Sequence, residues 1–131
     1  MNREGLEINN PEVVAEFTAA FRRYDPALLA NDVDILNELF WDSPRVVRFG
    51  ITENLYGHDS ISSYRRQDKI ISVPPRTVTK ETITTYGRSF ATTNVEYVQA
   101  KSGRRGRQSQ TWMRTAEGWR IVSAHVSLLA E

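Results

Sequence analysis

The stretch of sequence between residues 76 and 128 reads RTVTKETITTYGRSFATTNVEYVQAKSGRRGRQSQTWMRTAEGWRIVSAHVSL. Residues with a preference for strands recur in it, separated by short segments that contain glycine and charged residues. Links this short are typical of hairpins, so the stretch predicts an antiparallel meander. Its four predicted strands are Arg76 to Tyr86, Ser89 to Val98, Arg107 to Thr115 and Trp119 to Leu128.

The residues before this meander carry helix signals. Asn10 is a predicted N-cap, and Pro11 fits the first helical position. An apolar face with helical spacing follows and ends at Tyr24. We expect Pro26 to kink or interrupt this helix, because proline has no N–H to donate and crowds the preceding turn. A second, short helix is predicted over residues 33–40.

A short strand and a third helix complete the first half of the chain. Residues 46–51 are strand-like, and residues 52–56 are predicted to pair back as a hairpin arm. Gly57-His58-Asp59 opens the third helix, with Ile61 and Tyr64 on its apolar side. We interpret four charged side chains near its end as solvated: Arg65, Arg66, Asp68 and Lys69.

This order of elements predicts an α+β fold. Long antiparallel strands with helices on one face must bury those helices against the sheet. We therefore expect N-terminal helices packed on a strongly bent, mostly antiparallel sheet, a cone-shaped α+β roll whose open mouth would take a ligand. No repeat or linker divides the chain, so residues 1–131 are predicted to form a single domain.

The composition excludes several classes of protein. The chain has 131 residues and a net charge of +1 from 17 basic and 16 acidic residues, whereas a dedicated nucleic-acid binder shows a strong basic excess. Cysteine is absent, which excludes a disulfide framework and a thiol nucleophile. The sequence shows no signal-peptide h-region and no apolar run of the ~20 residues that a membrane span needs. We expect a soluble, cytoplasmic protein.

Arg48 is the residue most indicative of a site. It interrupts the apolar run of residues 46–49, so we expect its guanidinium to point into a partly dry place. A guanidinium there needs an anion, and its planar fork matches a carboxylate. Pattern alone leaves two other interpretations open, a solvated edge-strand arginine and an arginine paired with an acidic residue of the protein.

Two further side chains are candidates for proton transfer or ligand binding. Tyr24 ends the apolar face of the first helix, and its hydroxyl needs a partner; it could serve a substrate or a backbone carbonyl. His125 shares the parity of Ile121 and Ser123 on the last strand, as in a pocket floor or an interface. His58 is interpreted as a surface residue, and two histidines this far apart predict no metal site.

One strand face combines polar and aromatic side chains. This face could line a pocket or form a dimer interface, and the pattern favours the interface. Its residues are Gln108, Gln110, Trp112 and Arg114.

Several segments resemble the AtzH-like family of nuclear-transport-factor-2-like, or SnoaL-like, proteins, which are similar to the oxalurate-catabolism protein HpxZ. The similarity runs from about Val13 to Arg66 and continues more loosely to Ser127. The segments that carry it are Phe21-Arg22-Arg23-Tyr24, Asn31-Asp32-Val33, Leu39-Phe40-Trp41, Val47-Arg48-Phe49-Gly50 and Glu53-Asn54-Leu55-Tyr56-Gly57.

This resemblance implies the conical fold and a role in bacterial nitrogen catabolism beside amidase-signature hydrolases. It implies an enzyme that cleaves a small N-carboxylated urea such as 1,3-dicarboxyurea, with Tyr24 and Arg48 as the catalytic pair and no metal or cofactor. We expect a homodimer that acts on a small anionic substrate, with an amidase-signature enzyme as a candidate partner. The predicted substrate-binding residues are Trp41, Asn54, Tyr64, Trp112 and His125.

Three other functions remain open at the level of sequence. The domain could bind a metabolite without turnover as an accessory module, or it could serve only dimerisation. A third alternative is isomerase or cyclase chemistry on a larger apolar substrate, which would need an acidic general base inside the cone. No acidic residue can be placed inside the cone from the sequence alone.

Overall fold

The computed structural model describes residues 6–67 and 74–130. Among these residues the helices are α1 (Pro11–Phe21), α2 (Tyr24–Ala30), α3 (Val33–Leu39) and α4 (His58–Arg65). The strands are β1 (Val47–Phe49), β2 (Asn54–Tyr56), β3 (Arg76–Tyr86), β4 (Phe90–Gln99), β5 (Arg105–Thr115) and β6 (Gly118–Leu128). None of the described helices is long and apolar enough to cross a membrane.

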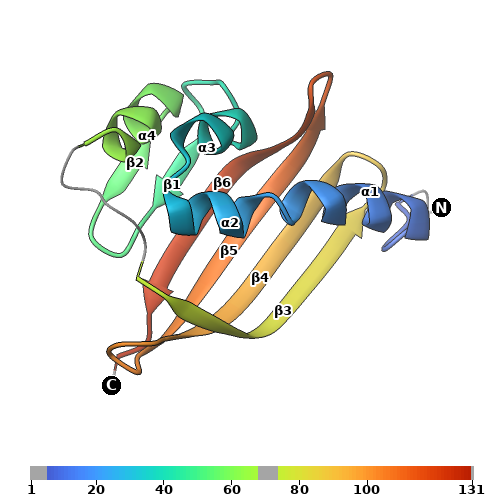
Figure 1. Ribbon diagram of the computed structural model, residues 1–131. Coiled ribbons are helices and arrows are strands. Elements are labelled where there is room, and N and C mark those ends of the chain that lie inside the picture. The colour runs from blue at the N-terminus through green and yellow to red at the C-terminus, as the bar shows by residue number, and fades with distance from the viewer. Residues whose placement is uncertain (1–5, 68–73, 131) are drawn as a thin grey trace.

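The strands form a mixed sheet in the order β2-β1-β6-β5-β4-β3 (Figure 1). The meander predicted for residues 76–128 is confirmed, because β3, β4, β5 and β6 pair in succession and antiparallel. The predicted hairpin of β1 and β2 is also present. β1 adds to the meander in the parallel direction and sets Arg48 opposite Ala124 of β6.

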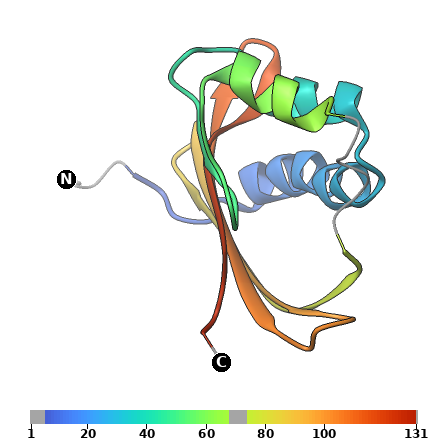
Figure 2. The ribbon, with the colours of Figure 1, turned by 90° about the vertical axis from the view of Figure 1, so that its left-hand side faces the viewer.

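The helices cover one face of a curved sheet, and Figure 2 shows the sheet bending around them. Phe17 of α1 is fully buried and lies edge-on to Trp112 and Trp119, with ring centroids 5.4 Å and 5.1 Å apart. Edge-to-face packing of this kind is favourable for aromatic rings and adds to the burial of their apolar surface. The predicted α+β roll with helices on one face is therefore confirmed.

The first helical region begins and breaks as the sequence predicts. The Asn10 side chain accepts hydrogen bonds from the backbone N–H groups of Glu12 and Val13, which caps α1. The helix is interrupted at residues 22–23 and resumes as α2 with Pro26 inside its first turn. Because Pro26 has no N–H to donate, the carbonyl four residues earlier in the chain gains no helical partner from it.

A β-bulge changes which side chains of β6 face the core. Thr111 lies opposite Ser123, but Trp112 lies opposite Ile121, so Val122 is an extra residue in β6. Alternation along a strand restarts after such an insertion. Ile121 is therefore buried whereas His125 is exposed, which corrects the prediction that these two residues share a face.

Gly106 of β5 is needed for the packing of Tyr97 on β4. A Cβ atom at position 106 would lie only 2.3 Å from the Tyr97 ring, which is itself buried. We predict that Gly106→Ala lowers the free energy of unfolding by about 1–3 kcal/mol, because the ring must move in a packed site. Urea denaturation measures this change.

Ser109→Ala is the control for this substitution, since Ser109 is exposed on the same strand. We expect the control to change the free energy of unfolding by less than about 0.5 kcal/mol. Wild-type stability of Gly106→Ala would show that the Tyr97 ring adapts without cost.

Candidate functional site

A pocket of about 410 Å³ opens between α2, α4 and the inner face of the sheet, within the usual range for small-molecule sites. Its lining residues on the long strands come from the ends of these strands that lie away from α1; Figure 1 shows these strand ends and α1. Its lining residues are Tyr24, Leu28, Asn31, Arg48, Ile51, Thr52, Glu53, Tyr64, Arg65, Pro74, Arg76, Tyr97, Gln99, Gln108, Val126 and Leu128.

Three arginines from three different elements line this pocket. Arg48 comes from β1, Arg65 from the last turn of α4 and Arg76 from the first residue of β3. Arg48 and Arg65 are 6% and 3% exposed, and the side chain of Arg76 is 3% exposed. Buried cations are costly unless they are paired, so the partners of each guanidinium determine what the pocket can bind.

Arg48 is paired with an acidic residue of the protein. Its Nη1 donates to Glu53 Oε2 at 2.7 Å, and its guanidinium lies 5.9 Å from the centre of the Tyr64 ring. The structure thus favours the paired interpretation of Arg48 that the sequence left open. Burial alone would raise the pKa of Glu53, but hydrogen bonds from Thr52 and Arg48 and the Arg48 charge outweigh burial and lower that pKa.

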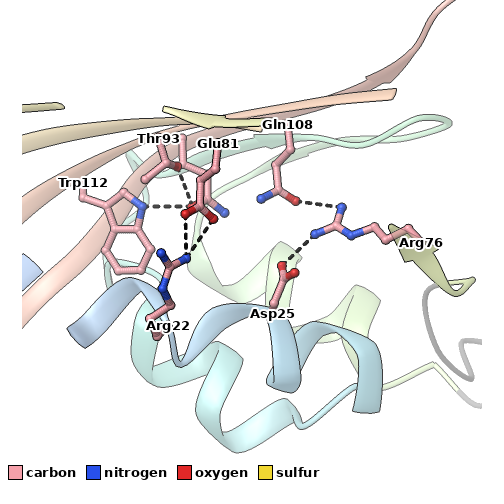
Figure 3. A network of polar contacts seen from close by, with 8 residues as sticks. Arg22, Asp25, Arg76, Glu81, Thr93, Gln108 and Trp112 are labelled. Carbon is pink, nitrogen blue, oxygen red and sulfur yellow. Dashed lines mark hydrogen bonds and ion pairs between the residues drawn. The ribbon is translucent and has the colours of Figure 1, made fainter. Parts of the chain in front are cut away.

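Arg76 is held on three sides, and Figure 3 shows two of its contacts, those with Asp25 and Gln108. Its Nη2 donates to Asp25 Oδ1 at 2.7 Å, its Nη1 donates to Gln108 Oε1 at 3.3 Å, and its guanidinium stacks over the Tyr97 ring at 4.6 Å. The carboxylate compensates the buried charge and the ring covers it. Arg76 therefore joins α2 to β4 and β5 at the floor of the pocket.

Arg65 differs from the other two arginines because no acidic side chain in the described part of the chain compensates its charge. Burial lowers the pKa of the Arg65 guanidinium, and repulsion from Arg48 lowers it further. The oxygen of Tyr24 acts in the opposite direction and raises this pKa. The Nε and Nη2 atoms of Arg65 are buried and have no hydrogen-bond partner among residues 6–67 and 74–130. Two guanidinium groups that repel each other across a pocket attract an anion placed between them.

The two pocket tyrosines lie beside these charges. Tyr24 is 1% exposed, and the centre of its ring lies 6.5 Å from that of Phe40. Its hydroxyl oxygen raises the pKa of the Arg65 guanidinium. Burial raises the pKa of the Tyr64 hydroxyl, and Glu53 raises it further. A hydroxyl with a raised pKa stays protonated, so Tyr64 can donate a hydrogen bond at neutral pH.

Unpaired donors are concentrated in this pocket. Of the buried side-chain nitrogen and oxygen atoms without a partner in the described part of the chain, five belong to pocket-lining residues. All five are N–H donors, which suits a ligand rich in acceptor oxygens. They are Arg48 Nε, Arg65 Nε, Arg65 Nη2, Arg76 Nε and Gln108 Nε2.

The structure brings together only part of the predicted site. Tyr24, Arg48 and Tyr64 line one pocket. Trp41 is half-buried beside the core, and Asn54 is exposed on β2. Trp112 is fully buried in the core, where its Nε1 donates to Gln110 at 2.9 Å (Figure 3).

His125, the remaining predicted ligand contact, lies outside this pocket. It is exposed on the outer face of the sheet, edge-on to Phe49 with ring centroids 5.6 Å apart. The bulge in β6 explains this placement, because it turns His125 away from the helices.

The interface interpretation of the face around Gln108 and Trp112 is also corrected. Gln108, Gln110 and Trp112 are at most 2% exposed, and they face the helices rather than a second protein. Of this face only Arg114 is exposed, and it pairs with Glu16 at 3.0 Å.

The interpretation of Arg65 as a solvated residue is wrong. Arg65 follows Ile61 by four residues, so both lie on the buried face of α4. That spacing was the signal in the sequence. Arg66 is exposed as predicted. Asp68 and Lys69 lie outside the described residues.

The surface interpretation of His58 is corrected as well. Its side chain is only 16% exposed, and its Nε2 lies 2.8 Å from the carbonyl oxygen of Asn37, to which it donates. The described residues contain no group of three or more histidine and acidic side chains arranged to hold a metal ion.

Comparison with protein families matches residues 6–131 to the AtzH-like family. The chain belongs to the AtzH-like family. None of the curated proteins matches it. Two solved structures are similar to this chain over nearly its whole length. A protein of unknown function from Pectobacterium atrosepticum is 45% identical, with a TM-score of 0.86, and the match covers 94% of this chain and 95% of that one. A cystatin-like fold protein from Burkholderia xenovorans is 42% identical, with a TM-score of 0.90 over 97% and 99% of the two chains.

The wider superfamily is also represented among solved structures. A nuclear-transport-factor-2-like protein from Salmonella enterica is 25% identical, with a TM-score of 0.73 over 92% of this chain and 94% of that one. The AtzH-like chain therefore has the cystatin-like, nuclear-transport-factor-2-like fold that the sequence predicted.

The pair of Arg48 and Glu53 predicts a pH dependence of stability. Because the pKa of Glu53 is lowered in the folded protein, its ionised form stabilises the fold above the unfolded-state value of about 4.3. That contribution is lost as pH falls through the lower folded-state pKa. We predict that wild type is more stable than Glu53→Gln at neutral pH and that this difference shrinks below about pH 4.

Urea denaturation of both proteins at a series of pH values measures this difference. A difference that stays constant down to acidic pH would contradict the lowered pKa of Glu53.

Proposed function

We propose that this AtzH-like protein is a small-molecule enzyme that cleaves a small N-carboxylated urea or ureido acid, such as 1,3-dicarboxyurea. The observation that supports this function best is the group of unpaired N–H donors on three arginines and a glutamine around one pocket. A small molecule with a carboxylate at each end and a carbonyl between them offers several acceptor oxygens and negative charge to these donors.

The reaction would proceed by loss of one carboxylate from a nitrogen atom. The N–C bond breaks, its electron pair remains on nitrogen, carbon dioxide leaves, and nitrogen takes up a proton to give allophanate. Attack of water on the same carboxyl group gives the same product with bicarbonate. In either case negative charge moves onto the urea portion, where N–H donors stabilise it.

Tyr24 and Arg48 would carry this step. Tyr24 is buried in the pocket wall with a phenolic proton that it can deliver to the leaving nitrogen. Arg48 is fixed by Glu53 through Nη1, which leaves Nε as a donor to the substrate. A fixed guanidinium loses little further freedom when the substrate binds, so it can stabilise the developing charge without reorganisation.

Isomerase-type chemistry fits this pocket less well. It needs an acidic general base inside the cone, and Glu53 is the acid that lines the pocket among the described residues. Glu53 is hydrogen-bonded to Arg48 and Thr52, and its pKa is lowered, which makes it a weak base. The second candidate is instead a non-catalytic binding module, since the same donors would hold an anion without turnover.

We predict that wild type converts 1,3-dicarboxyurea, generated in situ, to allophanate faster than the spontaneous rate. Tyr24→Phe should lower kcat by roughly a hundredfold or more, because it removes the proton donor. Tyr86→Phe is the matched control, since the Tyr86 hydroxyl meets Thr92 outside the pocket and its loss should leave kcat unchanged. Allophanate formed per unit time is the measurement.

A lack of acceleration by folded wild type would contradict the enzymatic function. Thermal stabilisation by a small dicarboxylate, without product, would then identify a binding module.

We also predict that Arg48→Lys lowers kcat/KM by at least about tenfold. A lysine ammonium lacks the planar fork with which the guanidinium can donate to Glu53 and to the substrate at the same time. Arg22→Lys is the matched control. Arg22 also pairs with a glutamate, Glu81, at 2.7 Å, but outside the pocket (Figure 3). Equal kcat/KM values for Arg48→Lys and wild type would exclude a role for the guanidinium geometry.

A further inference from the structure

The guanidinium of Arg65 is a buried cation for which the described residues supply no acidic partner. Arg48 has Glu53 and Arg76 has Asp25, each at 2.7 Å, whereas no ion pair of Arg65 occurs among the described residues. The backbone of this residue is held by Asn31, whose side chain donates to the Arg65 carbonyl at 3.0 Å. The pocket therefore carries one positive charge that no carboxylate of residues 6–67 and 74–130 neutralises.

The two unpaired atoms of Arg65 form a recognition geometry. Nε and Nη2 donate from the same edge of the planar guanidinium, as two parallel N–H groups. This edge matches the two oxygens of a carboxylate, which accept such a pair in a bidentate manner. A single water or hydroxyl oxygen cannot satisfy both donors in this geometry equally well.

The charges around Arg65 exclude the other pocket groups as its partner. Glu53 is engaged by Arg48 and Thr52, and Asp25 is engaged by Arg76. Repulsion from Arg48 lowers the pKa of the Arg65 guanidinium, whereas the hydroxyl oxygens of Tyr24 and Tyr64 raise it without supplying an acidic partner. A carboxylate that binds beside both guanidinium groups would offset this repulsion. It would also supply acceptors for Nε and Nη2 of Arg65.

We propose that Arg65, rather than Arg48, anchors the carboxylate by which the ligand is held. The ligand class is a small dicarboxylate: one carboxylate docks on Nε and Nη2 of Arg65 and is retained, and the other end reaches Tyr24 and the Nε of Arg48. The assignment of the second end as the reacting end rests on the proposed function. The anchoring itself does not, because it concerns binding and not turnover.

Binding of a stable dicarboxylate tests this anchor directly. Glutarate has as many atoms between its carboxylates as 1,3-dicarboxyurea has, and it cannot lose a carboxylate from nitrogen. Isothermal titration of glutarate should show that Arg65→Gln weakens binding by roughly tenfold to a hundredfold, because a charge-assisted bidentate contact is lost. Arg65→Lys should weaken it nearly as much, since the charge remains but the fork does not.

Arg66→Gln is the matched control. It removes the same charge from the next residue of the chain, but Arg66 is exposed and donates to Ser62 Oγ instead of lining the pocket. We expect its affinity for glutarate to equal that of wild type. Equal affinities of Arg65→Gln and wild type, or no saturable binding of glutarate to wild type, would overturn the proposal.

Stability distinguishes a ligand anchor from a structural arginine. Removal of an uncompensated buried charge should leave the midpoint of urea denaturation of Arg65→Gln unchanged or raise it, even though ligand binding is lost. A lower midpoint together with weaker binding would assign Arg65 a structural role and overturn the proposal. If Arg65→Gln loses glutarate binding but wild type shows no turnover, the anchor stands and the proposed enzymatic function fails.

Discussion

The ring of Phe17 against Trp112 and Trp119 is the contact on which the rest of the structure depends. It fixes α1 on one end of the curved sheet and excludes water there. Because the core occupies that end, the inner face of the sheet changes character along a single strand. Trp112 of β5 lies in the core, and its Nε1 donates a hydrogen bond to the Gln110 side chain. Gln108, two residues before Gln110 on the same strand, lines the pocket. The pocket is the part of the cone that the aromatic core leaves unfilled.

The break between α1 and α2 connects that core to the chemistry. It turns the chain at residues 22–23, so that Tyr24 enters the pocket wall and Asp25 reaches Arg76 across the cone (Figure 3). Arg76 in turn meets Gln108 and stacks on Tyr97. The floor of the pocket is thus built from compensated charges. The uncompensated positive charge of Arg65 therefore favours a negatively charged ligand.

Prediction from the sequence succeeded where the signal is local. The meander, the cap at Asn10, the interruption near Pro26 and the family follow from patterns within a few residues of each other. It failed for His125 because one extra residue in β6 reverses the faces of the strand, and a bulge leaves no mark in the pattern of side chains. It failed for Arg65 because we took its charge to indicate exposure. The helical spacing from Ile61, which places Arg65 on the buried face of α4, was given less weight.

The sequence by itself determined the elements, their order and the family, since propensity, capping and periodicity act between neighbours in the chain. It also indicated Tyr24 and Arg48 as candidate site residues. Only the tertiary structure decided which charges meet. Glu53 pairs with Arg48, Asp25 pairs with Arg76 across 51 residues of chain, and Arg65 receives no carboxylate from the residues that the structure describes. Electrostatic partners depend on distance and burial in space, and no pattern along the chain encodes either quantity directly.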